Sequence, residues 1–258
     1  MKPRMKLETA ENAHCQEMAL FQHDANYSIL VDGQELKSSR QHESQLELAR
    51  LGCAALTECP SPRVFVSGLG LGYTLREVLT LLGSKVRCVL GEPQDELLQW
   101  HRDHLSELNG HVLDDKRVEQ QSGDIVKLLS KTPRGFDAIL LDVDNGPGPN
   151  ASKQREAVYG REGLKACRAA LRDGGCLAVW SSEANKSFEE QLMRTGFHVR
   201  RFRVEAYPGS KSQGRYIWVA SDNKRSIPPG GGEPRLPAKP GPKGRQGPRR
   251  FGDGRRRS

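Results

Sequence analysis

Short apolar runs alternate with longer amphipathic segments between residues 61 and 222. The apolar runs have the length and the β-branched content of buried strands, and most segments between them have the apolar spacing of helices. Such alternation is typical of an α/β, Rossmann-like fold, in which helical crossovers give a doubly wound, mostly parallel sheet. We predict seven strands, at Val64–Ser67, Val86–Leu90, Val118–Gln121, Phe136–Asp142, Cys176–Ser181, His198–Val204 and Tyr216–Ala220.

The N-terminal part of the chain has the pattern of short strands joined by turns. Tyr27, Ile29 and Val31 alternate with other residues, and Asp32-Gly33 is a dipeptide typical of hairpin turns. Helical apolar spacing over Gln45–Leu56 then leads to two prolines before the first strand of the large sheet. We therefore expect residues 1–60 to form a small N-terminal β element with a linking helix, and residues 61–222 to form the Rossmann-like domain.

The C-terminal segment, residues 223–258, consists mainly of Pro, Gly, Arg and Lys from about Ser226 onward. Such a composition buries too little apolar surface to offset the entropy lost on folding, so we predict a disordered basic tail. The segment holds 11 of the 40 Lys and Arg residues and two acidic ones, so the net charge of +8 comes from the tail. This charge suits weak, salt-sensitive contact with RNA or another polyanion, although a solubilising extension would have the same composition.

No apolar run approaches the roughly 18 residues that a membrane-spanning helix needs, and the N-terminus lacks the apolar run of a secretory signal. We therefore expect a soluble, cytoplasmic protein without membrane insertion.

The six cysteines have no CxxC spacing, so they predict reduced thiols rather than a zinc site or a disulfide framework. His101 and His104 share a helix face without an evident third ligand, so no metal is expected.

A glycine-rich segment, VFVSGLGLGYTLREVL at residues 64–79, joins the first strand of the large sheet to a helix. Gly68, Gly70 and Gly72 lie at alternate positions of the turn, where a Cβ would keep the backbone amides away from a ligand. A plain strand-to-helix turn is the alternative when this motif is considered alone. The acids that follow the neighbouring strands favour a nucleotide-cofactor loop.

Three acids follow the second, third and fourth strands. Glu92 lies 24 residues after Gly68, where a strand-end carboxylate characteristically accepts hydrogen bonds from ribose hydroxyls. Asp124 can accept a hydrogen bond from an adenine amino group. Asp142 faces the reacting end of a ligand laid over the glycine loop, where it can bind a cation or accept a proton, so it is the predicted catalytic group. A solvated strand end, a common turn and a helix cap are the respective structural alternatives.

These motifs, with VDGQELKSSRQHES upstream and a GP pair after the fourth strand, resemble the spermidine synthase family of polyamine aminopropyltransferases over roughly residues 19–220. The resemblance implies a small N-terminal β domain before a Rossmann-like domain that binds decarboxylated S-adenosylmethionine. It assigns Glu92 to the ribose and Asp124 to the adenine. It makes Asp142 the proton acceptor for an amine substrate and gives Pro149 a contact with the cofactor.

The resemblance also extends to the amine substrate, with departures. Gln41-His42-Glu43 is similar to the family's amine-contacting Tyr-His-Glu or Tyr-Gln-Glu segment, so His42 is expected to contact the substrate. The acid expected inside the glycine loop is Leu71 here, and the second acid after the fourth strand falls on Asn145, beside Asp144, which can substitute for it. Each missing charged hydrogen bond should weaken the binding of a dication by about 1–3 kcal/mol. The resemblance is compatible with a homodimer.

Three functions fit the sequence. The first is aminopropyl transfer to a polyamine, and the second is methyl transfer from S-adenosylmethionine to a different acceptor. The third is a non-catalytic role in which the tail tethers a cofactor-fold protein to a polyanion. The two transferases share the adenosine contacts, so only the methionyl carboxylate, present in the intact cofactor alone, separates them. Leu71 favours methyl transfer, whereas His42 and the N-terminal β element favour aminopropyl transfer.

Overall fold

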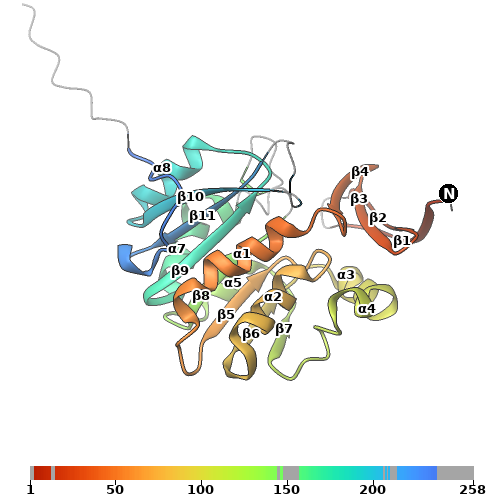
Figure 1. The fold of residues 1–258 in the computed structure, drawn as a ribbon, viewed down its shortest axis with the longest axis horizontal. Coiled ribbons are helices and arrows are strands. Elements are labelled where there is room, and N and C mark those ends of the chain that lie inside the picture. Colours follow the sequence, from red (N-terminus) through yellow and green to blue (C-terminus); the bar gives the residue numbers. More distant parts are fainter. Residues whose placement is uncertain are drawn as a thin grey trace, which may run out of the picture.

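The computed structural model describes residues 3–12, 15–143, 146–147, 157–205, 207, 209 and 214–236 of the 258-residue chain. Two sheets organise these residues: a four-stranded antiparallel sheet near the N-terminus and a seven-stranded mixed sheet flanked by helices (Figure 1). In the view of Figure 1 the small sheet, drawn in red and orange, stands to one side of the large one. The predicted α/β fold with a seven-stranded, mostly parallel sheet is confirmed.

The large sheet has the strand order β10-β11-β9-β8-β5-β6-β7. Neighbouring strands from β9 to β7 are parallel, whereas β11 runs antiparallel to both β9 and β10. Six strands lie within one residue of their predicted bounds, and β9 begins five residues earlier than predicted. The bounds are β5 (Arg63–Ser67), β6 (Arg87–Gly91), β7 (Val118–Gln121), β8 (Phe136–Leu141), β9 (Leu171–Ser181), β10 (His198–Val204) and β11 (Arg215–Ser221).

The strand order reverses direction at β5. From β5 the chain proceeds to β6 and β7 on one side and then returns to β8 on the other side. In open α/β sheets, ligands bind outside the carboxyl ends of the strands at such a switch point, because the connections there leave to opposite faces. The glycine-rich loop follows β5, and Asp142 follows β8. The topology therefore brings the loop and this acid to the same point.

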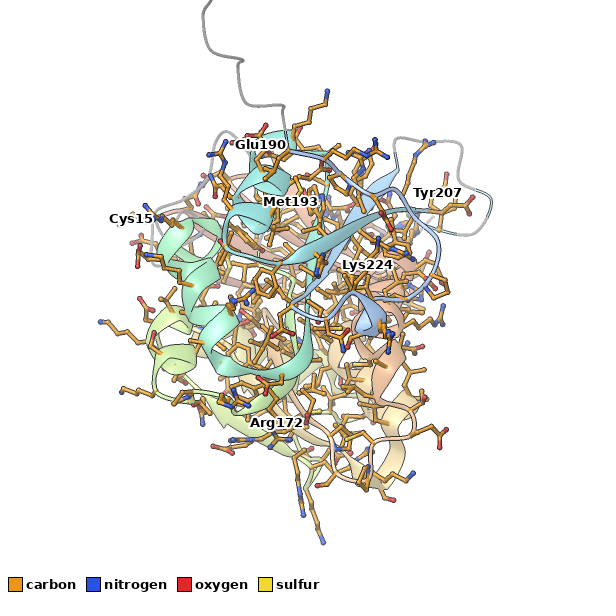
Figure 2. The ribbon with its side chains drawn as sticks, turned by 90° about the vertical axis from the view of Figure 1, so that its left-hand side faces the viewer. Cys15, Arg172, Glu190, Met193, Tyr207 and Lys224 are labelled. Carbon is orange, nitrogen blue, oxygen red and sulfur yellow. The ribbon has the colours of Figure 1, made fainter. Side chains whose placement is uncertain are left out.

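Helices cover both faces of the large sheet. On one face, α1 (Glu43–Cys53), α2 (Tyr73–Leu82) and α3 (Asp95–Trp100) share a buried core with Val64 and Val66 of β5. On the other face, α5 (Ile125–Ser130), α7 (Arg161–Ala170) and α8 (Lys186–Arg194) share a core with Phe65. Successive residues of β5 thus point to opposite layers, as strand geometry requires. Figure 2 shows the side of the molecule formed by α7 and α8.

The N-terminal sheet is a meander of β1 (Met5–Glu11), β2 (Glu17–His23), β3 (Asn26–Val31) and β4 (Gln34–Ser38). Asp32 and Gly33 have positive φ angles, of 48° and 76°, and close the hairpin between β3 and β4 at its predicted place. Met18, Leu20 and Ile29 of this sheet belong to the same buried core as the glycine-loop residue Leu69. This packing brings the small sheet against the loop that follows β5.

Residues 223–236 pack against the large sheet, although the sequence assigned them to the disordered tail. Ile227 is buried, and the backbones of Gly232 and Arg201 pair, so that this segment continues the sheet beyond β10. Glu233 forms ion pairs with Arg200 and with Lys224, which is labelled in Figure 2. The packed part of the chain therefore extends past the predicted boundary at residue 222. The burial of Ile227 and the backbone pairing of Gly232 with β10 both stabilise this segment. Residues 237–258 of the predicted tail lie outside the described residues.

Within the described ranges, no helix is long and apolar enough to cross a bilayer. The same part of the chain contains no group of three or more His, Cys, Asp or Glu side chains arranged to hold a metal ion. All six cysteines are free thiols. Burial raises the pKa of the Cys88 and Cys167 thiols to about 12, so these two are unreactive at neutral pH.

Candidate active site

A cleft lies where the carboxyl ends of β5, β6 and β8 meet the N-terminal sheet. It encloses about 600 Å³ of empty space, the part open to solvent included, of which about 70 Å³ is wide enough for a water-sized group. The glycine loop and the acids Glu92 and Asp142 line it from the large sheet. Its apolar lining from the small sheet consists of Met18, Ile29, Val31 and Leu36. The loop and two of the three predicted acids therefore face one space between the two sheets.

The glycine loop has the backbone conformation that its sequence predicts. Gly68, Gly70 and Gly72 have φ angles of +85°, +53° and +86°, which side chains with a Cβ rarely adopt. A Cβ on Gly68 would collide with the backbone carbonyl oxygen of Asp142, and a Cβ on Gly72 would lie 2.9 Å from the Asn109 side chain. Glycine is thus required both by the turn and by the close approach of the loop to β8.

Glu92 is buried at the end of β6 and holds the glycine loop. One carboxylate oxygen accepts a hydrogen bond from the Leu69 amide at 2.8 Å, and the other accepts one from the Gln94 amide at 3.1 Å. A carboxylate has about four acceptor positions, so a residue that orders the loop can also accept from a ligand hydroxyl. Glu92 therefore lies in the cleft where the sequence placed a ribose-binding acid, and it also shapes that cleft.

Asp142, at the end of β8, forms a buried ion pair with Lys37 of β4. Lys37 Nζ lies 2.6 Å from Asp142 Oδ1, and their side chains are 6% and 4% exposed. The same ammonium lies 4.5 Å from the ring centroid of Trp180 on β9, within cation–π range. The predicted catalytic carboxylate is therefore bound to a cation that the N-terminal sheet supplies.

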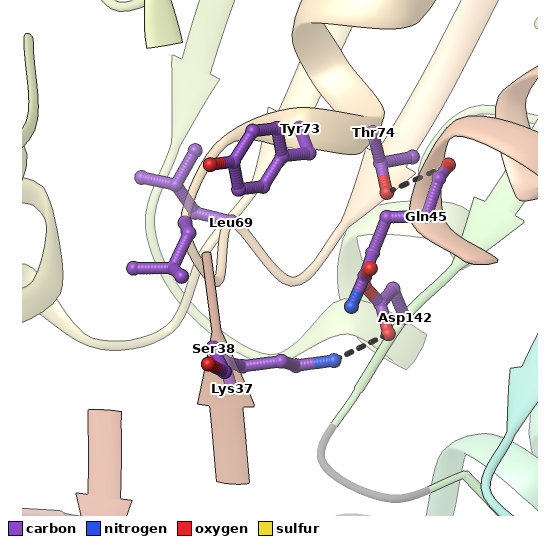
Figure 3. A pocket seen from close by; sticks show the side chains of 8 residues that line it. Lys37, Ser38, Gln45, Leu69, Tyr73, Thr74 and Asp142 are labelled. Carbon is purple, nitrogen blue, oxygen red and sulfur yellow. Dashed lines mark hydrogen bonds and ion pairs between the residues drawn. The ribbon is translucent and has the colours of Figure 1, made fainter. Parts of the chain in front are cut away.

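A second, smaller pocket lies on the other side of this ion pair (Figure 3). Figure 3 shows Lys37 extending from β4 to Asp142, with the Gln45 side chain beside Asp142 and with Tyr73 and Thr74 across the pocket. About 10 Å³ of this pocket is wide enough for a water-sized group, which is room for about one water molecule. Lys37 and Asp142 line both the cleft and the pocket. The ion pair therefore belongs to the lining of both spaces.

His42, predicted to contact substrate, lies at the start of α1. Its ring stacks on that of Tyr73, with centroids 4.2 Å apart and an interplanar angle of 14°, and its Nδ1 lies 2.7 Å from the Ser39 carbonyl oxygen. Tyr73 lines the small pocket, as does Leu71, which replaces the acid expected in the loop. Burial raises the pKa of Tyr73, so this residue is a neutral phenol at physiological pH. His42 thus supports the wall of the pocket through Tyr73.

Asp124 begins α5 and caps it. Its side chain accepts a hydrogen bond from the Lys127 amide at 2.9 Å, and it is exposed. Asp124 does not line the cleft, whereas its neighbour Ile125 does. The described geometry thus gives Asp124 the structural role of a helix cap, whereas the sequence had offered a common turn as the alternative to an adenine contact. The predicted site residues Asp144, Asn145 and Pro149 lie outside the described residues.

A buried histidine, His101, contacts the backbone of the glycine loop. His101 Nε2 lies 2.8 Å from the Gly70 carbonyl oxygen, and its Nδ1 lies 2.6 Å from the Asn109 amide nitrogen. These partners assign a neutral ring that donates to Gly70 and accepts from Asn109. Burial lowers the pKa of His101 to about 4. His101 lies in a π-helical turn, His101–Leu105, which places it inward toward the loop.

The sequence did not indicate the roles of Lys37 and His101. Lys37 is one of 40 basic residues, and nothing in its strand distinguishes it. Its partner, Asp142, lies 105 positions further along the chain. The sequence places His101 and His104 on one helix face, but the two side chains have separate partners, Gly70 for the first and Glu8 for the second. Only the packing of the small sheet and of the π-helical turn His101–Leu105 against the loop reveals both roles.

Comparisons with known proteins were made at the level of sequence and of fold. No family model matches the chain. The chain is 30% identical over 163 residues to polyamine aminopropyltransferase 2 of Pseudomonas aeruginosa PAO1, a match that covers 62% of this chain and 44% of that protein. It is 26% identical over 215 residues to the polyamine aminopropyltransferase of Aeropyrum pernix, covering 81% of this chain and 67% of that protein. The matched region thus spans less than half of the Pseudomonas relative.

Solved structures with the same fold include a spermidine synthase in complex with the transition-state analogue AdoDATO. The likeness has a TM-score of 0.72 at 20% identity and covers 87% of this chain and 77% of that one. The spermidine synthase of Thermotoga maritima matches with a TM-score of 0.70, also at 20% identity, over 87% of this chain and 76% of that one. At this level of identity the likeness establishes the fold alone.

Proposed function

Because the chain belongs, as a distant member, to the polyamine aminopropyltransferase (spermidine synthase) family, we propose that it transfers an aminopropyl group from decarboxylated S-adenosylmethionine to an amine. The observation that carries the proposal is the common cleft of the glycine loop, Glu92 and Asp142. A nucleoside bound there would have its ribose near the end of β6. Its reacting end would then lie near Asp142, at the switch point of the sheet.

The residues of the cleft fit an adenosyl group. The loop at Gly68 has no room for a Cβ, so its backbone can approach a ligand closely. Glu92 supplies a buried carboxylate for ribose hydroxyls, and Leu36 with Ile29 supplies apolar surface. Asp124 and Pro149 remain proposed contacts.

Asp142 would perform the proton chemistry. An aliphatic amine with a pKa near 10 is protonated at neutral pH and cannot attack the carbon next to a sulfonium until it loses a proton. Asp142 would accept that proton; the amine nitrogen then bonds to the carbon as the carbon–sulfur bond breaks, and the sulfur leaves as a neutral thioether. The carboxylate is placed by β8 and is withdrawn from bulk water, which strengthens its attraction for a cation.

The test is a search for products by mass spectrometry. Purified protein is incubated with decarboxylated S-adenosylmethionine and a panel of mono-, di- and triamines, and with intact S-adenosylmethionine and the same panel. We expect aminopropylated amine and methylthioadenosine from the decarboxylated form. Asp142→Asn should abolish the product, whereas Asp103→Asn, on the exposed surface after α3, should leave it unchanged.

Binding of the two nucleosides separates this proposal from methyl transfer. The second candidate is favoured by Leu71, which is buried and gives the small pocket an apolar wall in place of an acid. In calorimetry, a preference for intact S-adenosylmethionine over the decarboxylated form would reject aminopropyl transfer and favour the methyltransferase. Product formed equally by wild type and Asp142→Asn would remove Asp142 from either mechanism.

A further inference from the structure

The surroundings of Asp142 form a site for an ammonium group. A carboxylate oxygen lies on one side of the Lys37 nitrogen at 2.6 Å, and the face of the Trp180 ring lies on another at 4.5 Å. A carboxylate and an aromatic face are the two groups that best recognise an alkylammonium in a protein. Both come from the large sheet, on β8 and β9, whereas the ammonium comes from β4 of the small sheet. The cation and its site therefore belong to different sheets.

The position of this ion pair is not one that stability alone explains. Removing two charges from water costs about as much as their attraction returns, so a buried pair is a weak source of stability. Lys37 nevertheless lies at the junction of the cleft and the small pocket, and its aliphatic chain passes 3.6–3.8 Å from the place where a Cβ of Gly70 would be. The pair thus occupies the point at which a nucleoside in the cleft would meet an acceptor.

The small pocket has neither the room nor a second carboxylate for another cation. The small pocket has room for about one water molecule while Lys37 is in place. Its described lining includes Leu69 and Leu71, and Asp142 is the only acid among those lining residues. A diamine would need to displace Lys37 for its first ammonium and would find no second carboxylate on these walls for the other.

We propose that Lys37 is a specificity-determining residue whose ammonium takes the place at Asp142 that an acceptor ammonium would otherwise occupy, so that the site selects against dicationic diamines. The proposal rests on the proposed function for the statement that this place receives the acceptor. It predicts that acceptors with a second ammonium group near the reacting nitrogen are disfavoured while Lys37 occupies this place.

Chemical rescue tests the proposal. Lys37→Ala removes a propylammonium group from the site, so free propylammonium should refill it and raise the Tm of this variant by about 3 °C or more. Wild type should show no such shift, because Lys37 fills the site. Lys116→Ala, on the exposed surface, is the matched control for the substitution. Tetramethylammonium at the same concentration is the control for ionic strength, since it is a cation without an N–H donor.

A second variant covers the case in which Lys37→Ala does not fold without an amine. Lys37→Gln keeps an N–H donor toward Asp142 and removes the charge. Its affinity for diaminobutane, measured by calorimetry with methylthioadenosine present, should exceed that of wild type at least tenfold. In the product assay, both Lys37 variants should use the diamine with a KM at least tenfold below that of wild type.

The outcomes separate the two proposals. If propylammonium shifts wild type and Lys37→Ala equally, or neither of them, and diaminobutane binds wild type as well as Lys37→Gln, the assignment of Lys37 is wrong. If rescue occurs but no protein forms product from any amine, the ammonium site stands and the proposed transferase function fails. Methylthioadenosine binding by all variants shows that the cleft is intact in each comparison.

Discussion

Lys37 Nζ of the N-terminal sheet lies 2.6 Å from Asp142 Oδ1 at the end of β8, and both side chains are almost fully buried. Breaking such a pair leaves one charge without its partner in a site that excludes water. Each single substitution, Lys37→Met or Asp142→Asn, should therefore lower the free energy of unfolding by about 3–5 kcal/mol.

The double variant Lys37→Met/Asp142→Asn should be less destabilised than the sum of the two single variants, because it has no uncompensated buried charge. Urea unfolding of the four proteins completes the double-mutant cycle. Strict additivity would show that the two charges do not interact in solution. Lys6→Met with Glu17→Gln, an exposed pair on β1 and β2, is the control cycle and should give a coupling of at most about 1 kcal/mol.

His101 should make stability depend on pH. Burial lowers its pKa to about 4, against about 6.5 in an unfolded chain. Between these values the unfolded state binds the proton and the folded state does not. The contribution of His101 to the free energy of unfolding is therefore fully present above pH 6.5 and is lost as the pH falls toward 4. The free energy of unfolding should fall by about 2 kcal/mol at pH 5 and by roughly 3 kcal/mol at pH 4.

The measurement is urea unfolding of wild type and His101→Gln across this pH range. The variant lacks the titrating ring, so the stability difference between the two proteins should shrink by about 2 kcal/mol from pH 7.5 to pH 5. His198→Gln, which alters an exposed histidine on β10, is the matched control substitution. A constant difference for His101→Gln would contradict a buried, neutral ring under Gly70.

Glu92→Gln should weaken nucleoside binding. A glutamine can keep only one carbonyl oxygen toward the amides of Leu69 and Gln94, and its amide group then faces an N–H donor. We expect methylthioadenosine to bind at least tenfold more weakly, a loss of about 1.4 kcal/mol, with a loss of stability of about 1–3 kcal/mol. Calorimetry gives the affinity. Glu96→Gln, an exposed change on the adjoining α3, should bind like wild type.

Gly68→Ala should disrupt the cleft more than its backbone angle explains. The substitution adds a left-handed alanine, which costs roughly 1–2 kcal/mol, and it also drives a Cβ into the Asp142 carbonyl oxygen. Gly110→Ala is the matched control, because Gly110 has φ +74° and a Cβ added there would have nothing within 4 Å. We expect Gly110→Ala to lose about 1 kcal/mol and keep methylthioadenosine binding, whereas Gly68→Ala should lose more stability and the binding. Equal behaviour of the two variants would mean that the loop can move away from β8.

The sequence by itself determined the layout of this protein, because its signals are local. Apolar runs such as the one ending at Ser67 have the period and length of buried strands, and helical spacing between them defines a crossover fold. The glycines at 68, 70 and 72 predict a turn that only glycine adopts at low cost. Glu92 follows at a separation that corresponds to one helical crossover between two neighbouring parallel strands. These patterns involve neighbours in the chain, so they are visible before folding.

The tertiary structure decided which groups meet in the cleft. Lys37 reaches Asp142 because the small sheet packs on the glycine loop, and His101 reaches Gly70 because the π-helical turn His101–Leu105 lies against the same loop. Asp124 comes three residues after the end of β7, and its carboxylate caps α5 by accepting a hydrogen bond from the Lys127 amide. Contacts between distant segments depend on the way whole elements pack, and no local pattern of residue types encodes that geometry.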